Sequence, residues 1–201
     1  MGYGIVLGAL ALAAPAMGAS REPGEESASR PRITVRVWDQ GDFDAGVLGA
    51  AEMVVDHIFA KAHVTVSWRH CTPSGVEHDS ECLEPQGPDE ASVRVIDRRT
   101  AENARESLLA GRAVRSSVWE GSGLVYVYRD RIEAVSQKAD IPVSVILGTV
   151  ITHEIGHLLL PRGHSALGIM RGEVDLRGWT LAQQGNLLFT AEQSRAFRRN
   201  H

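Results

Sequence analysis

Cysteine is scarce in this sequence, which contains only 2 among its 201 residues. That number excludes a small scaffold stapled by several disulfides and a protein with several zinc fingers. Glycine and proline, at 20 and 8 residues, are too few for a collagen-like or low-complexity chain. Excess positive charge is also lacking, since the formal net charge is −4, which argues against a dedicated nucleic-acid-binding protein. With 43% hydrophobic residues, the chain is long enough for one globular domain with a full core.

The first 31 residues have the pattern of an exported protein. An apolar run at residues 5–15 is too short to cross a bilayer but has the length of a signal-peptide core, with a buried helix or an uncleaved anchor as the alternatives. We predict a signal peptide over residues 1–18 and a flexible, polar tail over residues 19–31, followed by one domain at 32–201. We therefore expect a secreted or periplasmic (extracytoplasmic) monomer with no membrane span after signal removal.

The two cysteines lie close together in the stretch CTPSGVEHDSEC, at Cys71 and Cys82. In an oxidising compartment, such a pair predicts one local disulfide. A Cys/His metal site that also uses His70 and His78 is the alternative, although the spacing matches no familiar zinc module.

Hydrophobic periodicity predicts an α/β fold. Residues 44–63 carry apolar side chains at spacings of three and four, which predicts an amphipathic helix between two β-branched strands. A strand–helix–strand unit implies a parallel pair with a right-handed crossover. The predicted strands are residues 32–38, 64–68, 92–97 and 123–129, with 112–119 as a weaker candidate.

A second helix is predicted over residues 143–160, and it is apolar nearly all round, as a buried helix is. Its histidines and glutamate argue against a membrane span. Pro161 and Gly163 end the helix, because proline lacks a donor and glycine permits a turn. Thr190 and Gln193 form a capping-box pattern that opens a last helix.

The buried helix carries the motif His153-Glu154-Ile155-Gly156-His157. Positions i and i+4 lie on one face of a helix, so both imidazoles reach one metal ion, while a carboxylate beside it polarises a water molecule. A catalytic zinc site needs a third protein ligand and an open fourth position. His164 is the best candidate, ahead of Glu173 and Asp175.

Residues 153–170, HEIGHLLLPRGHSALGIM, resemble the zinc-binding segment of the metzincin metalloproteases, and the matrixin branch in particular. The resemblance implies zinc ligation by His153, His157 and His164, with Glu154 as general base and acid. Met170 would form the methionine turn beneath the metal. The implied fold is a single domain: a twisted, mostly parallel sheet with an antiparallel edge strand, a backing helix, a buried active-site helix and a C-terminal helix. Substrate would lie extended along the edge strand at 112–119.

With two departures from the matrixin pattern, the chain resembles a divergent member of that branch. Leu160 stands where the family has a glycine, and His164 follows His157 by seven residues instead of six. We expect no cysteine-switch propeptide, because no cysteine stands in such a motif in this sequence.

The predicted function is that of a secreted zinc-dependent endopeptidase that hydrolyses peptide or protein substrates. One alternative is a zinc-binding but inactive binding module on the same scaffold. The other is a metal-free domain in which the histidines are core residues.

Overall fold

The computed structural model describes residues 30–40, 42–71, 80–97, 110–117, 121–161 and 163–200. The predicted signal peptide lies outside these residues, as does the predicted tail apart from Arg30 and Pro31.

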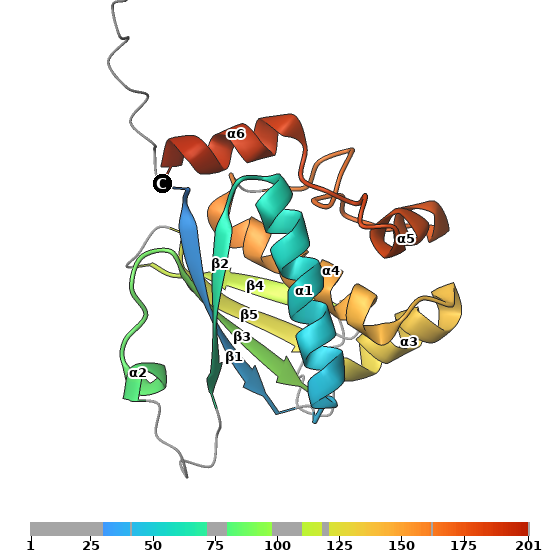
Figure 1. Cartoon of the computed structure of the whole chain (residues 1–201), viewed down its shortest axis with the longest axis horizontal. Coiled ribbons are helices and arrows are strands. Elements are labelled where there is room, and N and C mark those ends of the chain that lie inside the picture. The colour runs from blue at the N-terminus through green and yellow to red at the C-terminus, as the bar shows by residue number, and fades with distance from the viewer. Residues whose placement is uncertain are drawn as a thin grey trace, which may run out of the picture.

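A five-stranded sheet forms the centre of the domain, with the strand order β2-β1-β3-β5-β4 (Figure 1). The pairs β1–β2, β1–β3 and β3–β5 are parallel, and β4 at the edge is antiparallel to β5. This arrangement confirms the predicted mixed α/β fold with an antiparallel edge strand. The strands are β1 (Arg32–Asp39), β2 (Thr65–Cys71), β3 (Glu90–Ile96), β4 (Gly111–Arg115) and β5 (Gly123–Tyr128).

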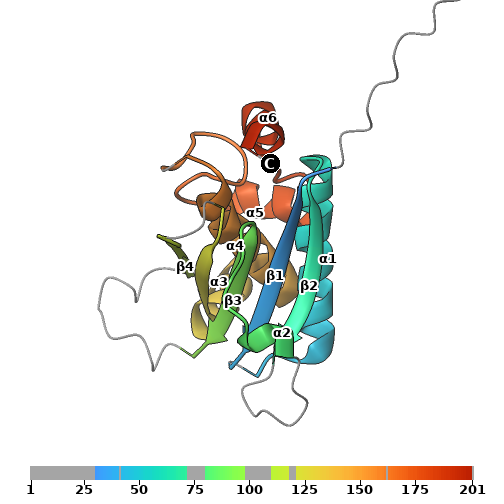
Figure 2. The same cartoon turned by 90° about the vertical axis from the view of Figure 1, so that its left-hand side faces the viewer.

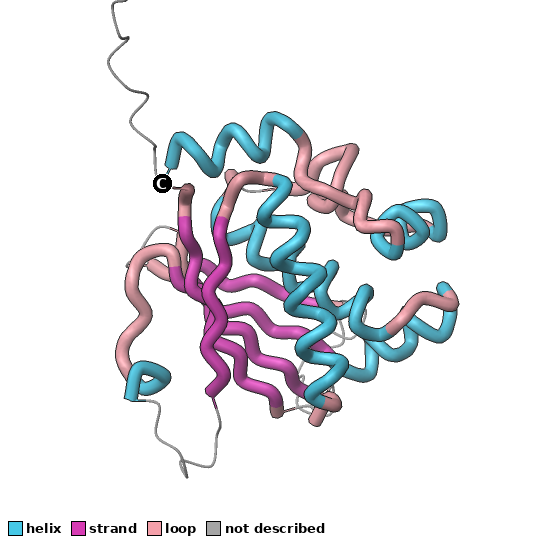
Figure 3. Tube along the Cα trace, in the orientation of Figure 1, coloured by secondary structure: helices cyan, strands magenta, loops and turns pink. Residues whose placement is uncertain are grey.

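The principal helices, α1 (Ala45–Lys61) and α4 (Val143–Leu159), pack against each other on one face of the sheet. Figure 2 views the sheet from its other face, with both helices behind it, and Figure 3 shows the same layers as a tube. The Asp44 carboxylate begins α1 by accepting a hydrogen bond from the Gly46 N–H at 2.8 Å. Most of α4 is buried, as its all-round apolar sequence predicted.

A buried ion pair connects strands β1 and β3 on the opposite face of the sheet. The Arg36 guanidinium donates to both carboxylate oxygens of Glu90, at 2.6 and 2.9 Å, and also to the carbonyl of Glu84. These contacts tie the segment after the short helix α2 (Ser80–Leu83) to the sheet. The predicted disulfide between Cys71 and Cys82 is present.

Around the cysteines, His70 faces Glu52, with 3.3 Å between Nε2 and Oε1. His78, the other histidine of the alternative metal site, lies outside the described residues.

Three further helices complete the described chain. The predicted capping box opens α6 (Ala191–Asn200): the Gln193 amide accepts from the Thr190 N–H at 2.9 Å, and the Thr190 hydroxyl accepts from the Gln193 N–H at 3.3 Å. Helices α3 (Arg129–Ala139) and α5 (Leu176–Gln183) were not predicted from the sequence. Among the helices described, none is long and apolar enough to cross a bilayer.

Candidate metal centre

Helix α4 places two histidines of the motif on one face. The Nε2 atoms of His153 and His157 lie 3.0 Å apart, and their rings meet edge to face. Both side chains are half-buried near the C-terminal end of the helix, where it faces the edge of the sheet.

The chain after α4 returns His164 to the same point. Leu160 leaves the helix in an extended conformation, with φ −105° and ψ 161°, which the following proline favours. The left-handed turn comes at Gly163, where φ is +110°. A glycine is therefore not needed at position 160, and the turn accommodates the seven-residue spacing. His164 Nε2 lies 3.2 Å from His157 Nε2.

Within the described part of the chain, these three histidines are the one group of three or more His, Cys, Asp or Glu side chains placed to hold a metal, with their ligand atoms within 4.8 Å of one another. The rival third ligands lie elsewhere. The Asp175 carboxylate accepts from the Gly178 N–H at 2.7 Å and caps α5, and Glu173 is exposed and outside the group.

The loop that ends at Met170 orients His153. The ring Nδ1 of His153 donates to the Ile169 carbonyl, 2.8 Å away, so a neutral ring presents its lone pair at Nε2. The Met170 carbonyl accepts a hydrogen bond from the Ser165 N–H at 2.9 Å, and the Met170 side chain is buried. Gly156 leaves space for this methionine, because a Cβ atom there would collide with Met170 Sδ.

The surroundings keep the imidazoles of the two histidines on α4, His153 and His157, neutral. Burial lowers the pKa of His153, and the charge of His164 adds to the effect, against the Ile169 hydrogen bond. Burial also lowers the pKa of His157 to about 4, with smaller contributions from His153, His164 and Arg115. Neutral imidazoles are the form that binds a metal.

The donor set fits a zinc ion. With zinc–nitrogen bonds of about 2.0–2.1 Å, two nitrogens on one tetrahedral ion lie about 3.3 Å apart. The observed separations of 3.0 and 3.2 Å are close to that value. Three nitrogens also leave the fourth position open, as catalytic sites do.

Glu154 lies between α4 and the edge strand. Its side chain is buried, which raises its pKa to about 7, and a hydrogen bond from the Ala113 N–H of β4 acts in the opposite direction. Gly111, also on β4, makes room for it: a Cβ atom at position 111 would lie 2.8 Å from both Glu154 Cγ and Val150 Cγ1. The sequence could not identify Gly111 or Ala113 as site residues, because only the packing of β4 beside α4 brings them to this carboxylate.

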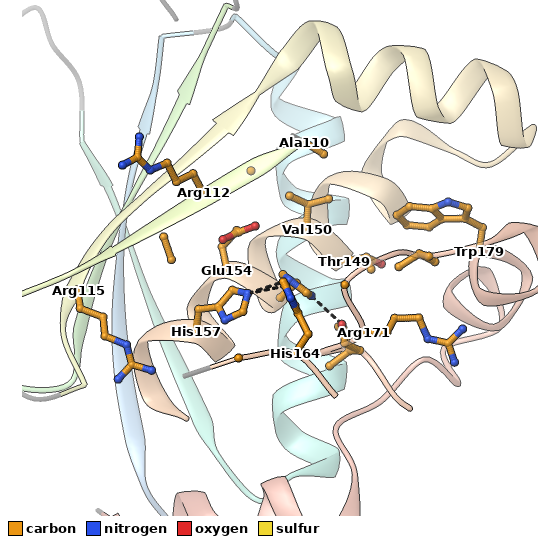
Figure 4. A pocket seen from close by; sticks show the side chains of 17 residues that line it. Ala110, Arg112, Arg115, Thr149, Val150, Glu154, His157, His164, Arg171 and Trp179 are labelled. Carbon is orange, nitrogen blue, oxygen red and sulfur yellow. Dashed lines mark hydrogen bonds between the residues drawn. The ribbon is translucent and has the colours of Figure 1, made fainter. Parts of the chain in front are cut away.

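The side chains of the three histidines and of Glu154 all line one pocket of about 680 Å³ (Figure 4). The strand β4 forms one wall, and Val174 and Trp179 belong to another. Trp179 packs against the core and also lines this pocket. A tryptophan in a short helix carries no sequence signal that separates these two positions.

No family model and no curated protein matches the sequence. Among solved structures, the chain is similar to the crystal structure of archaemetzincin from Methanopyrus kandleri, with a TM-score of 0.51 and 12% sequence identity. The similarity covers 84% of this chain and 95% of the archaemetzincin chain. At that identity the likeness concerns the fold alone. The domain therefore has a metzincin-like fold and a three-histidine group that could bind a metal ion.

Proposed function

We propose that this chain is a secreted zinc-dependent endopeptidase. His153, His157 and His164 hold the metal, and Glu154 serves as general base and acid. The observation that carries the proposal is the meeting, in one pocket, of three imidazole nitrogens, a buried carboxyl group and the edge strand of a sheet.

Each of these residues has a distinct role in peptide hydrolysis. A zinc ion on three imidazoles supplies a Lewis acid that activates water near neutral pH and polarises a carbonyl. The Glu154 carboxylate accepts the proton of the attacking water and then transfers it to the nitrogen of the leaving amine. The Ala113 N–H holds this carboxylate toward the pocket. The Ile169 carbonyl keeps the His153 ring in place, and Met170 lies against Gly156 of the same helix.

The substrate binds as an added strand. Strand β4 lies at the edge of the sheet and pairs with β5 on its inner side. The outer side of β4 offers its backbone groups to an extended peptide. Backbone pairing gives affinity without fixing the sequence of the peptide. Because β4 also lines the pocket, a peptide paired there passes directly in front of Glu154.

The proposal extends to the location of the protein. The apolar run at residues 5–15 serves as the core of a signal peptide that ends at residue 18, and the mature chain acts outside the cytoplasm as a monomer. The Cys71–Cys82 disulfide is compatible with such a compartment.

The decisive test is cleavage of an unfolded protein by purified, zinc-loaded chain. We expect the Glu154→Gln variant to lose activity by at least about a hundredfold while retaining zinc. Full zinc content without turnover on a broad peptide library would instead favour the inactive binding module. Activity that survives the substitution unchanged would refute the role of Glu154.

A further inference from the structure

The loop that carries the third histidine is attached to the C-terminal part of the chain. We name residues 164–170 the ligand loop. The Ile169 N–H donates to the Leu188 carbonyl at 2.9 Å, while the Ile169 carbonyl accepts from the ring of His153. Gly168 approaches the same segment so closely that a Cβ atom there would lie 2.6 Å from the Leu188 oxygen. The segment before α6 therefore supports the end of the ligand loop, and with it the orientation of His153.

The start of the ligand loop is held by a side chain of α6. Gln193, in the first turn of this helix, donates from its Nε2 to the Ser165 hydroxyl at 3.2 Å. Its Oε1 accepts from the Thr190 N–H at 2.9 Å and so caps the helix. Ser165 directly follows His164 in the sequence. One amide group thus connects the start of α6 to the neighbour of a proposed zinc ligand.

The hydrogen-bond network determines which way the Gln193 amide points. A backbone N–H only donates, so the atom that faces Thr190 is the carbonyl oxygen of the amide. On the other side, the single hydroxyl proton of Ser165 is donated to the Leu167 carbonyl, 2.6 Å away, so the Ser165 oxygen accepts from Gln193. The two contacts therefore require an acceptor and a donor on one side chain. An amide has both, whereas a carboxylate has only acceptors.

We infer that Gln193 is a positioning residue of the metal centre, because it holds the ligand loop in the conformation that brings His164 to His153 and His157. A loop that is ordered before binding loses less conformational freedom when it binds. The metal is therefore bound more tightly than it would be by a loose loop. This inference rests on the proposed zinc site and assigns part of its affinity to the C-terminal helix.

Replacement of Gln193 by glutamate separates the two contacts of this side chain. Glutamate has the same size and still caps the helix, because its carboxylate accepts from the Thr190 N–H. At neutral pH its other oxygen has no proton to donate to Ser165. We expect Gln193→Glu to bind zinc about fivefold more weakly, which corresponds to the loss of one hydrogen bond. Competition with a chromophoric chelator at neutral pH measures the affinity for zinc alone, without substrate.

Two controls separate the lost hydrogen bond from the added charge. By charge alone, a new carboxylate would attract a cation and tighten binding. Gln183→Glu, at the exposed end of α5, adds the same charge and should not weaken zinc binding. Ser165→Ala removes the acceptor, so Gln193→Glu should cause no further loss of affinity in that background.

Two results would overturn the inference. One is equal zinc affinity of wild type and Gln193→Glu. The other is a Gln193→Glu variant that loses as much affinity in the Ser165→Ala background as in wild type, because the effect would then not pass through this contact.

A measurement without metal separates this inference from the proposed function. In chelator-treated protein, Gln193→Glu should speed amide hydrogen exchange at Ser165 and Ile169 about fivefold, and exchange within α1 should not change. If wild type binds no zinc but this difference in exchange is found, the proposed peptidase fails and the hold of α6 on the ligand loop stands. If wild type binds zinc and cleaves protein, but neither zinc affinity nor exchange responds to Gln193→Glu, only the inference fails.

Discussion

Two features of its environment shift the pKa of Glu154 in opposite directions. Its burial disfavours the charged carboxylate and raises its pKa to about 7, while the Ala113 N–H favours the charged form. A general base near pH 7 requires such a balance, because the group must accept a proton and then release it. His153 and His157 have the complementary property: burial lowers the pKa of each and keeps both rings available to a metal.

The raised pKa of Glu154 predicts how the stability of the metal-free protein depends on pH. Between pH 4.5 and 7 the folded chain keeps the Glu154 proton while the unfolded chain loses it, so stability falls as pH rises through this range. Glu154→Gln removes that loss. In chelator-treated protein, raising the pH from 4.5 to 8 should therefore stabilise the variant by about 3 kcal/mol relative to wild type. The wild-type loss accumulates at about 1.36 kcal/mol per pH unit and ends near the raised pKa of about 7. Urea unfolding at the two pH values measures the difference, and equal pH dependence of the two proteins would contradict it.

The position of Glu154 also depends on the absence of a side chain at residue 111. Gly111→Ala places a Cβ atom 2.8 Å from Glu154 Cγ, so the carboxylate must move. A displacement of about 1 Å can cost about a hundredfold in kcat. Zinc content should not change, and Gly49→Ala on α1 is the matched control, because a Cβ atom there meets nothing within 4 Å. Full activity of Gly111→Ala would show that the strand does not position the base.

Among the elements, α4 and β4 form the site together, and the loops around them hold it. The Gln193 side chain of α6 accepts from the Thr190 N–H and donates to the Ser165 hydroxyl at 3.2 Å. Ser165 in turn bonds Met170 through its backbone. The C-terminal helix is thus linked through hydrogen bonds to the loop that orients His153.

This link predicts a stability effect at the start of α6. Thr190→Ala removes the hydroxyl that caps the helix and should lower the free energy of unfolding by about 1 kcal/mol. The hydroxyl of the exposed Thr180 bonds within its own helix, so Thr180→Ala should change stability by less than about 0.5 kcal/mol. Denaturant titration compares the two variants, and equal stability loss in both would argue against the cap.

Sequence periodicity predicted the elements that are long or strongly patterned. Helices α1 and α4 carry enough apolar residues to be predicted from hydrophobic periodicity, and the capping-box pattern predicted the start of α6. Helix α3 was missed because its sequence, RDRIEAVSQKA, is largely polar and buries only Ile132 and Ser136. Helix α5 has eight residues, with Gly178 inside it, and its capping residue Asp175 was considered as a metal ligand.

At the site, local spacing was sufficient for His153, Glu154 and His157, because all three lie on one helix. His164 required the path of the loop, which the turn at Gly163 now explains. Gly111, Ala113 and Trp179 reach the site only through tertiary packing, and a local pattern contains no information about such contacts.

For the whole molecule, a bound metal would add a further link between helix α4 and the loop that follows it. His153 and His157 belong to α4, and His164 belongs to the loop beyond it. An ion held by all three would favour the folded chain over the unfolded one.

Removal of zinc should therefore destabilise the entire domain. A chelator should lower the unfolding free energy by about 4 kcal/mol when free zinc had been at a thousand times its dissociation constant. His164→Ala, which lacks one ligand, should show little further change with chelator. A wild-type melting curve that chelator does not move would favour the metal-free alternative.

Metal analysis of the purified protein shows directly whether the three histidines bind zinc. Elemental analysis should find one zinc per chain in wild type and in Glu154→Gln, and far less than one in His164→Ala after dialysis. Wild type without zinc, or His164→Ala with a full complement, would contradict the account.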